Sequence, residues 1–206
     1  MAYFPMFIDL SNKNCLVVGG GNIAYQKVKV LSEFGADITV VSEDIDYRIS
    51  ELSKKLKVKS FEEEDIKNMS LVVAATDDEK LNHRISLLCK NAGIPVNAVD
   101  QKDDCTFIFP AIVKEKELVA AISSGGSSPL MAQGIKKKVS EILSEELGEI
   151  NDGLGACREY VKSQVNDIDK RKAVFKRIYE ESINENKMIS NERIQEIIQE
   201  IIADEL

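Results

Sequence analysis

Several residue types are scarce in this chain of 206 residues, and each shortage excludes a class of protein. There is no tryptophan and only one histidine, His83, so a metal site built from histidines alone is excluded. The four cysteines are scattered without the C-x-x-C spacing of a structural zinc site or a redox pair. We therefore expect ordinary thiols in a reducing compartment.

Long apolar runs and a basic surface are also lacking. No run approaches the roughly 20 apolar residues that span a bilayer, and no basic region followed by an apolar one begins the chain. The sequence predicts a cytoplasmic protein with no membrane partner. A net charge of −8 argues against a nucleic-acid partner. Residues 141–206 hold 16 acidic and 9 basic side chains, so the acidity belongs to the C-terminal third.

The stretch Cys15–Ala24 is the most informative part of the chain, because an apolar run breaks into three glycines and resumes as a helix. The pattern Gly19-x-Gly21-x-x-Ala24 fits a dinucleotide-binding turn. The first glycine permits a tight turn, the second lets the backbone approach a pyrophosphate, and Ala24 lets helix and strand pack closely. A glycine turn between any strand and helix can look the same, so the context decides.

Strands and helices alternate around this turn. Apolar runs predict strands over residues 16–18, 37–41, 58–61, 70–75 and 95–99. Periodic segments between them predict helices after the glycines, over 46–56, and from Thr76 to about Gly93. The alternation predicts an α/β fold with a Rossmann-like parallel sheet, whose ligands bind at the carboxyl ends of the strands.

Three candidate groups follow the ends of predicted strands. Glu43 and Asp44 follow the second strand, where an acidic side chain holds ribose hydroxyls and favours NAD over NADP. Asp44 fits a solvated loop acid equally well. Thr76 and Glu79 have the spacing of a capping box. Asp100 ends the last strand and is either a reactive carboxylate or a surface helix cap.

The alternation stops near residue 106. Strand-like runs cover 106–109, 111–113 and 118–122, and the last two predict a hairpin around a charged turn. The loop Ser123–Pro129 precedes a helix expected over residues 130–147. This loop is either a second anion site or a flexible linker before a proline-capped helix. The remainder is helical, with apolar stripes that usually form core or dimer contacts.

Five motifs make the chain resemble a known family. They are Val17–Gly21, Ala74–Asp78, Val96–Asp100, Phe107–Ala111 and Ser123–Pro129. Over roughly residues 5–145 the succession resembles precorrin-2 dehydrogenase/sirohydrochlorin ferrochelatase, the N-terminal module of siroheme synthase. The resemblance implies NAD-dependent oxidation of precorrin-2 to sirohydrochlorin and, in bifunctional members, insertion of ferrous iron. It also implies a homodimer whose central segment forms the contact.

The resemblance assigns roles and boundaries. Asp100 matches the catalytic aspartate, and no metal ligand is assigned. The expected domains are an NAD-binding Rossmann-like domain (1–113), a small α+β dimerisation and substrate-loop segment (114–147) and a helical C-terminal domain (148–206). The cofactor-binding residues are Gly19, Gly21, Asn22, Ile23, Glu43, Asp44 and Thr76, and the substrate-binding residues are Ser123, Ser124, Gly125, Gly126 and Ser127.

The tetrapyrrole substrate carries many carboxylates, so positive side chains should gather near it. The candidates are Arg84, Lys102, Lys136, Lys137 and Lys138, each of which fits a solvated surface charge as well. A rival hypothesis is an NAD-sensing regulatory module without catalysis. The hairpin and the Ser123–Pro129 loop favour the enzyme, because a pure sensor needs neither.

Overall fold

The computed structural model describes residues 3–203 and divides into two compact units, Met1–Phe109 and Pro110–Leu206. The sequence placed 111–113 in the sheet domain, whereas these residues pair within a separate hairpin. It also placed a boundary before Gly148, which lies inside a continuous helix.

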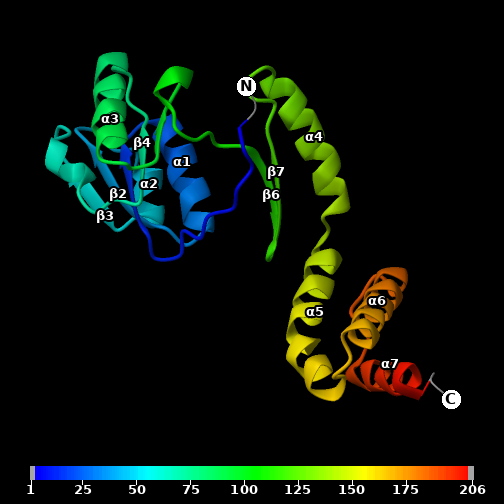
Figure 1. Cartoon of the computed structure of the whole chain (residues 1–206). Helices are drawn as coiled ribbons and strands as arrows, with labels where there is room; N and C mark the ends of the chain where they lie inside the picture. Colours follow the sequence, from blue (N-terminus) through cyan, green and yellow to red (C-terminus); the bar gives the residue numbers. More distant parts are fainter. Residues whose placement is uncertain (1–2, 204–206) are drawn as a thin grey trace. The chain divides into compact units, whose positions relative to one another are not determined.

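The first unit is built on a five-stranded sheet in which every neighbouring pair is parallel (Figure 1). The strand order β3-β2-β1-β4-β5 places the first strand at the centre. The strands are β1 (Asn14–Val18), β2 (Asp37–Ser42), β3 (Lys55–Val58), β4 (Leu71–Ala74) and β5 (Val96–Ala98). This confirms the predicted α/β, Rossmann-like fold.

Alternate residues of β1 supply the two faces of the sheet, as strand geometry requires. Cys15 and Val17 pack with the helices α1 and α2, whereas Leu16 and Val18 pack with η1 and α3. All four side chains are at most 2% exposed, so the central strand is covered on both faces. The covering elements are α1 (Asn22–Glu33), α2 (Tyr47–Leu52), the 3₁₀ helix η1 (Glu63–Ile66) and α3 (Glu79–Asn91).

Three local predictions for this unit are wrong. The third strand begins at Lys55, three residues before the expected position, because the preceding helix already ends at Leu52. The run 106–109 is not a strand, and a second 3₁₀ helix, η2 (Lys102–Asp104), lies just before it. Thr76 does not cap α3, because Asp78 accepts hydrogen bonds from the amides of Lys80 and Leu81.

The second unit begins with the predicted hairpin, in which β6 (Ala111–Glu115) pairs antiparallel with β7 (Leu118–Ile122). The expected helix over 130–147 is two helices, α4 (Pro129–Ile142) and α5 (Glu145–Gln164). The break falls at Ser144, whose hydroxyl accepts a hydrogen bond from the amide of Leu147 and so starts a new helix.

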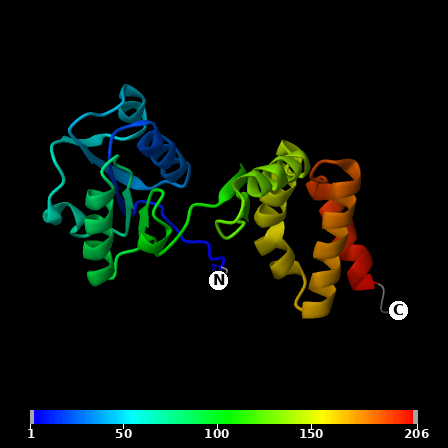
Figure 2. The same ribbon diagram turned by 90° about the horizontal axis from the view of Figure 1, so that it is seen from above.

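The helices α5, α6 (Ile168–Glu185) and α7 (Asn191–Ala203) pack side by side (Figure 2). Their shared core contains fully buried residues from each helix, Val161, Ile178 and Ile197. Gly153 lets the side chain of Met188 approach α5 closely, since a Cβ at this position would lie 2.5 Å from Cγ of Met188. The predicted apolar stripes are therefore mostly core, although Ile168 is 64% exposed.

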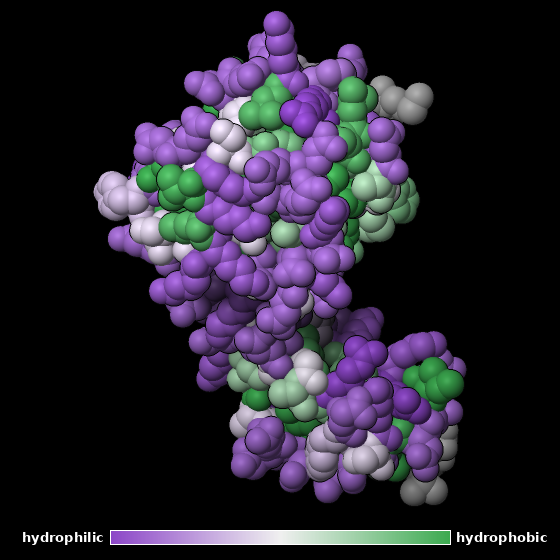
Figure 3. Space-filling view, turned by 90° about the vertical axis from the view of Figure 1, so that its left-hand side faces the viewer, coloured by the Kyte–Doolittle hydropathy of each residue, from purple (hydrophilic) through white to green (hydrophobic). Residues whose placement is uncertain are grey.

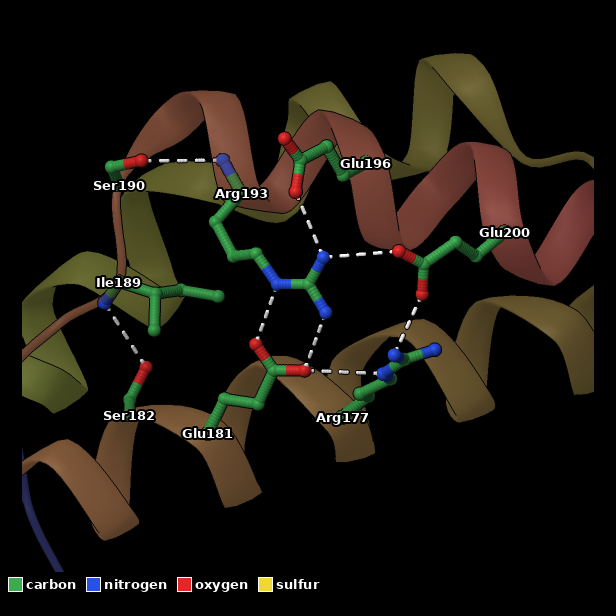
Figure 4. A network of polar contacts seen from close by, with 8 residues as sticks. All are labelled: Arg177, Glu181, Ser182, Ile189, Ser190, Arg193, Glu196 and Glu200. Atoms are coloured by element: carbon green, nitrogen blue, oxygen red, sulfur yellow. Dashed lines mark hydrogen bonds and ion pairs between the residues drawn. The ribbon is translucent and has the colours of Figure 1, made fainter.

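Arg193 on α7 connects this helix to α6 through ion pairs (Figure 4). Nε and Nη2 of Arg193 donate to the two carboxylate oxygens of Glu181 on α6, at 2.8 and 2.9 Å. Nη1 of Arg193 donates to Glu196 and Glu200 at 2.8 and 3.0 Å. Glu200 also receives Nη2 of Arg177 at 2.6 Å, so the charges alternate in sign across the two helices.

No helix between residues 3 and 203 is both long and apolar enough to cross a membrane. Hydrophilic residues occupy most of the face seen in Figure 3, and apolar residues form scattered patches among them.

Candidate functional site

The three glycines after β1 are needed for three different reasons. Gly19 has a φ of +118°, and a Cβ there would lie 2.3 Å from the carbonyl oxygen of Ala75. At Gly20 a Cβ would lie 1.9 Å from the carbonyl oxygen of Asp44. At Gly21, which caps the N-terminus of α1, a Cβ would meet no described atom within 4 Å. Gly19 and Gly20 let neighbouring backbone segments approach closely, whereas Gly21 leaves open space at the N-terminus of α1.

That space belongs to a cavity of about 600 Å³ at the carboxyl ends of β1, β2 and β4. Its position agrees with the rule for ligand sites in open parallel sheets. All seven residues predicted to bind the cofactor line it, namely Gly19, Gly21, Asn22, Ile23, Glu43, Asp44 and Thr76. Residues separated by more than fifty positions are thus brought around one space.

Acidic groups and hydroxyls dominate the β2 end of the cavity. Glu43 accepts a hydrogen bond from the hydroxyl of Ser60, and both residues line the space. Lys59 is also in the lining, but its ammonium pairs with Glu62 at 2.6 Å and with Asp65 at 2.9 Å. The charge of Lys59 is therefore already neutralised by carboxylates.

Arg48 connects the glycine turn to the loop after β2. Its guanidinium binds Asp46 and donates to Oδ1 of Asn22 at 3.1 Å, and it stacks 4.3 Å from the ring centroid of Tyr25. Hydrogen bonds from Arg48 lower the pKa of Asp46 to about 2. The amide of Asp46 in turn donates to the carbonyl of Gly20 at 2.8 Å. The Arg48–Asp46 pair therefore holds the glycine turn and the loop after β2 in place on two sides of the cavity.

Thr76 is held by a residue that sequence patterns did not single out. The Thr76 hydroxyl donates to Oδ1 of Asn82 at 2.7 Å, and the Asn82 amide donates back to the carbonyl of Thr76 at 2.9 Å. Asn82 is 2% exposed. Its polar side chain within the buried face of α3 was the sequence signal that could have identified it.

Asp100 lies just after β5, at the same edge of the sheet but outside the lining of the cavity. Its φ of +61° is a left-handed conformation that Asp tolerates better than most residues. It is exposed, and the N-cap of η2, the short helix that follows, is Gln101, so Asp100 is not a helix cap. The residue before it is fixed by a hydrogen bond from the amide of Val99 to the carbonyl of Ala74, at 2.9 Å.

The predicted substrate loop belongs to the second unit, between β7 and α4. Ser123 accepts a hydrogen bond from the amide of Gly125 at 3.0 Å, and Ser124 accepts one from Ser128 at 3.1 Å. Gly126 has a φ of +85°. Ser128 caps α4, and Pro129 occupies its first turn, as the capped-helix interpretation expected. These hydrogen bonds describe an ordered turn that presents Ser127 beside a helix N-terminus.

Other candidates have different surroundings. Arg84 pairs with Glu63 at 2.7 Å, and His83 is an exposed side chain beside Asp104 at 2.8 Å. Within the described part of the chain, no three His, Cys, Asp or Glu side chains could hold a metal ion together. The four cysteines are unpaired, and burial raises the pKa of Cys15 to about 11. They are core or partly buried thiols, as expected.

Comparisons with known proteins agree with this geometry. A family described as "Putative NAD(P)-binding" matches residues 6–111. Siroheme synthase from Ruthia magnifica is 38% identical over 200 residues, which are 95% of this chain and 42% of that protein. Siroheme synthase from Neisseria meningitidis is 32% identical, covering 98% of this chain and 42% of that protein. The chain thus spans less than half the length of these curated relatives.

A similar solved structure matches nearly the full length of both chains. The protein named "SirC, precorrin-2 dehydrogenase" superposes with a TM-score of 0.78 at 29% identity, over 97% of this chain and 99% of its own. The likeness therefore includes both the sheet unit and the helical unit.

Proposed function

The chain belongs to the family described as "Putative NAD(P)-binding", and from that premise we propose that it is an NAD-dependent dehydrogenase that oxidises precorrin-2 to sirohydrochlorin. One observation carries the proposal: a cavity at the carboxyl edge of the sheet gathers all seven expected cofactor residues. The relatives named siroheme synthase and precorrin-2 dehydrogenase support the choice of substrate.

The residues around the cavity fit a dinucleotide. The open space at Gly21 leaves room for a pyrophosphate against the first amides of α1, where the helix dipole favours negative charge. Glu43 is placed to accept hydrogen bonds from ribose hydroxyls. Lys59 and Arg48 are already paired with carboxylates, which supports NAD over NADP. When bound, the nicotinamide supplies a hydride acceptor.

Asp100 is the proposed base. Dehydrogenation removes a hydride and a proton, and an exposed carboxylate at this edge of the sheet accepts the proton. Ser123, Ser124, Gly125, Gly126 and Ser127 are proposed to contact the tetrapyrrole through hydroxyls and amides.

Insertion of ferrous iron is a second proposed reaction at the same base. Asp100 would accept pyrrole protons as the iron, a substrate, enters the ring. Anaerobic incubation of the protein with sirohydrochlorin and ferrous iron tests it against a protein-free control. Equal rates in the two samples would leave a dehydrogenase only.

The homodimer is also a proposal, supported by an exposed apolar face on α4. Met131 and Ile142 share one side of this helix and are 60% and 65% exposed, beside a sheet of only two strands. Met131→Glu combined with Ile142→Glu should shift the sedimentation of a dimer to that of a monomer. Ile168→Glu, at a position 64% exposed on α6, is the matched control and should leave the dimer intact.

One spectroscopic experiment separates the dehydrogenase from an NAD-sensing module. Purified protein, NAD and precorrin-2 should give NADH and sirohydrochlorin together, each followed by its absorbance. If intact precorrin-2 stays unoxidised while NAD binds, the enzyme proposal is wrong and the sensor explains the cavity.

A further inference from the structure

Lys27 of α1 is a half-buried lysine whose ammonium lies over an aromatic ring. Its Nζ is 4.3 Å from the ring centroid of Phe109, a cation–π contact. Lys27 directly precedes Val28, a fully buried residue of the same helix, so it lies at the border of the stripe that packs on the sheet. Its aliphatic stem is therefore partly covered while its charge remains near the surface.

The ring beneath this ammonium is connected to the strand that carries Asp100. The buried amide of Asn97 in β5 donates to the carbonyl of Phe107 at 3.0 Å. The rings of Phe107 and Phe109 then contact each other, with centroids 5.4 Å apart. These contacts hold the aromatic support of Lys27 against the sheet, so the position of the ammonium is set relative to β5.

No carboxylate within residues 3–203 forms an ion pair with Lys27 within 4 Å. This distinguishes it from Lys57 and Lys59, which share the buried Asp65 at 2.9 Å each. Burial lowers the pKa of Lys27, and the negative charge of Asp100 acts in the opposite direction. The charge of Asp100 thus acts on the Lys27 ammonium, although no described carboxylate forms an ion pair with it.

We propose that Lys27 binds a peripheral carboxylate of the tetrapyrrole and so holds the substrate next to Asp100. The inference rests on the proposed function and adds a residue to its site. A polycarboxylate needs cations at the reacting edge, and a partly desolvated ammonium makes a stronger charge-assisted hydrogen bond than an exposed one. Arg84, a candidate from the sequence, already pairs with Glu63.

The competing explanation is that Lys27 only stabilises the unit through its contact with Phe109. The two explanations differ in what they predict for substrate binding. A purely structural lysine affects unfolding and leaves the KM for precorrin-2 unchanged. A carboxylate-binding lysine changes that KM in a charge-dependent way, with little effect on the affinity for NAD.

Lys27→Met removes the charge and keeps the stem, and Lys27→Arg keeps the charge. Lys29→Met, at an exposed position on the same helix, is the matched control. We expect Lys27→Met to raise the KM for precorrin-2 about tenfold or more, the effect of losing one charged hydrogen bond. Lys27→Arg should recover most of it. NAD affinity by calorimetry should match that of the control.

A KM for Lys27→Met equal to that of Lys29→Met would overturn the inference. If Lys27→Met does not fold, Lys27→Gln serves instead, with the same expected rise and the same contrary result. Wild-type protein that fails to oxidise precorrin-2 would overturn the proposed function instead. In that event, direct titration with sirohydrochlorin still tests Lys27, since equal affinity in wild type and Lys27→Met would exclude its role.

Discussion

A Cβ at Gly19 would lie 2.3 Å from the carbonyl oxygen of Ala75. The glycine turn therefore packs directly against the backbone that follows β4. In addition, Gly19 has a φ of +118°, a conformation that L-residues rarely adopt. Gly19→Ala should therefore destabilise the protein by about 2 kcal/mol or more, through a clash and backbone strain together. Urea unfolding followed by circular dichroism measures the loss. An unchanged midpoint would mean that the turn rearranges at no cost.

Gly21→Ala should behave differently, because a Cβ there meets no described atom within 4 Å and the φ of −84° suits alanine. We expect stability to change by less than about 1 kcal/mol. The affinity for NAD should fall about tenfold or more, because the methyl group enters the space proposed for the pyrophosphate. Calorimetric titration with NAD checks this. Full affinity in a folded variant would place the cofactor elsewhere.

Asp100→Asn should lower kcat for precorrin-2 oxidation by about 10²- to 10⁴-fold, the usual contribution of a general base. The affinity for NAD should stay within about twofold, because Asp100 lies outside the lining of the cavity. Steady-state kinetics and calorimetry measure the two effects. Loss of NAD binding with kcat retained would show a structural residue instead of a base.

Acidification should weaken the helical bundle through Glu181. Hydrogen bonds from Arg193 lower the pKa of this carboxyl in the folded protein. Its contribution to stability is therefore complete above the unfolded pKa of about 4.3 and is lost as the pH falls through the lower folded value. Because the pair is partly exposed, we expect about 1 kcal/mol.

Urea unfolding at pH 7 and at about pH 3 tests the effect of Glu181→Gln. The variant should be less stable at pH 7 and should lose less stability on acidification. Glu180→Gln is the control, since that carboxylate forms a longer ion pair with Lys176, at 3.7 Å. The same acid loss in wild type and Glu181→Gln would show that the network contributes no net stability.

The parallel sheet could be predicted because buried strands such as Leu71–Ala74 are continuous apolar runs bounded by turns. The gathering of Gly21, Glu43 and Thr76 followed from the rule that parallel strands end at one edge. The start of the strand Lys55–Val58 was misplaced because the helix expected over 46–56 ends at Leu52.

Other parts of the site depend on contacts between residues distant in the sequence. Asn82 reaches Thr76, and Ser60 reaches Glu43 across adjacent strands, neither of which follows from local spacing. The contact of Lys27 with the ring of Phe109 likewise joins residues far apart in the sequence. Periodicity predicts which face of a helix is buried, but it does not identify the partner of each side chain.

The two outer strands of the sheet also protect the protein from its own copies. An unpaired strand edge is a template for aggregation, and lysine side chains discourage it. β3, at one edge of the sheet, carries Lys55 and Lys57, which form ion pairs with Asp37 and Asp65 of the same unit. At the other edge β5 has only three residues, and Thr106 occupies both the amide and the carbonyl of Val96. Growth of this sheet by strand addition is therefore disfavoured at both edges, which directs any self-association to other surfaces.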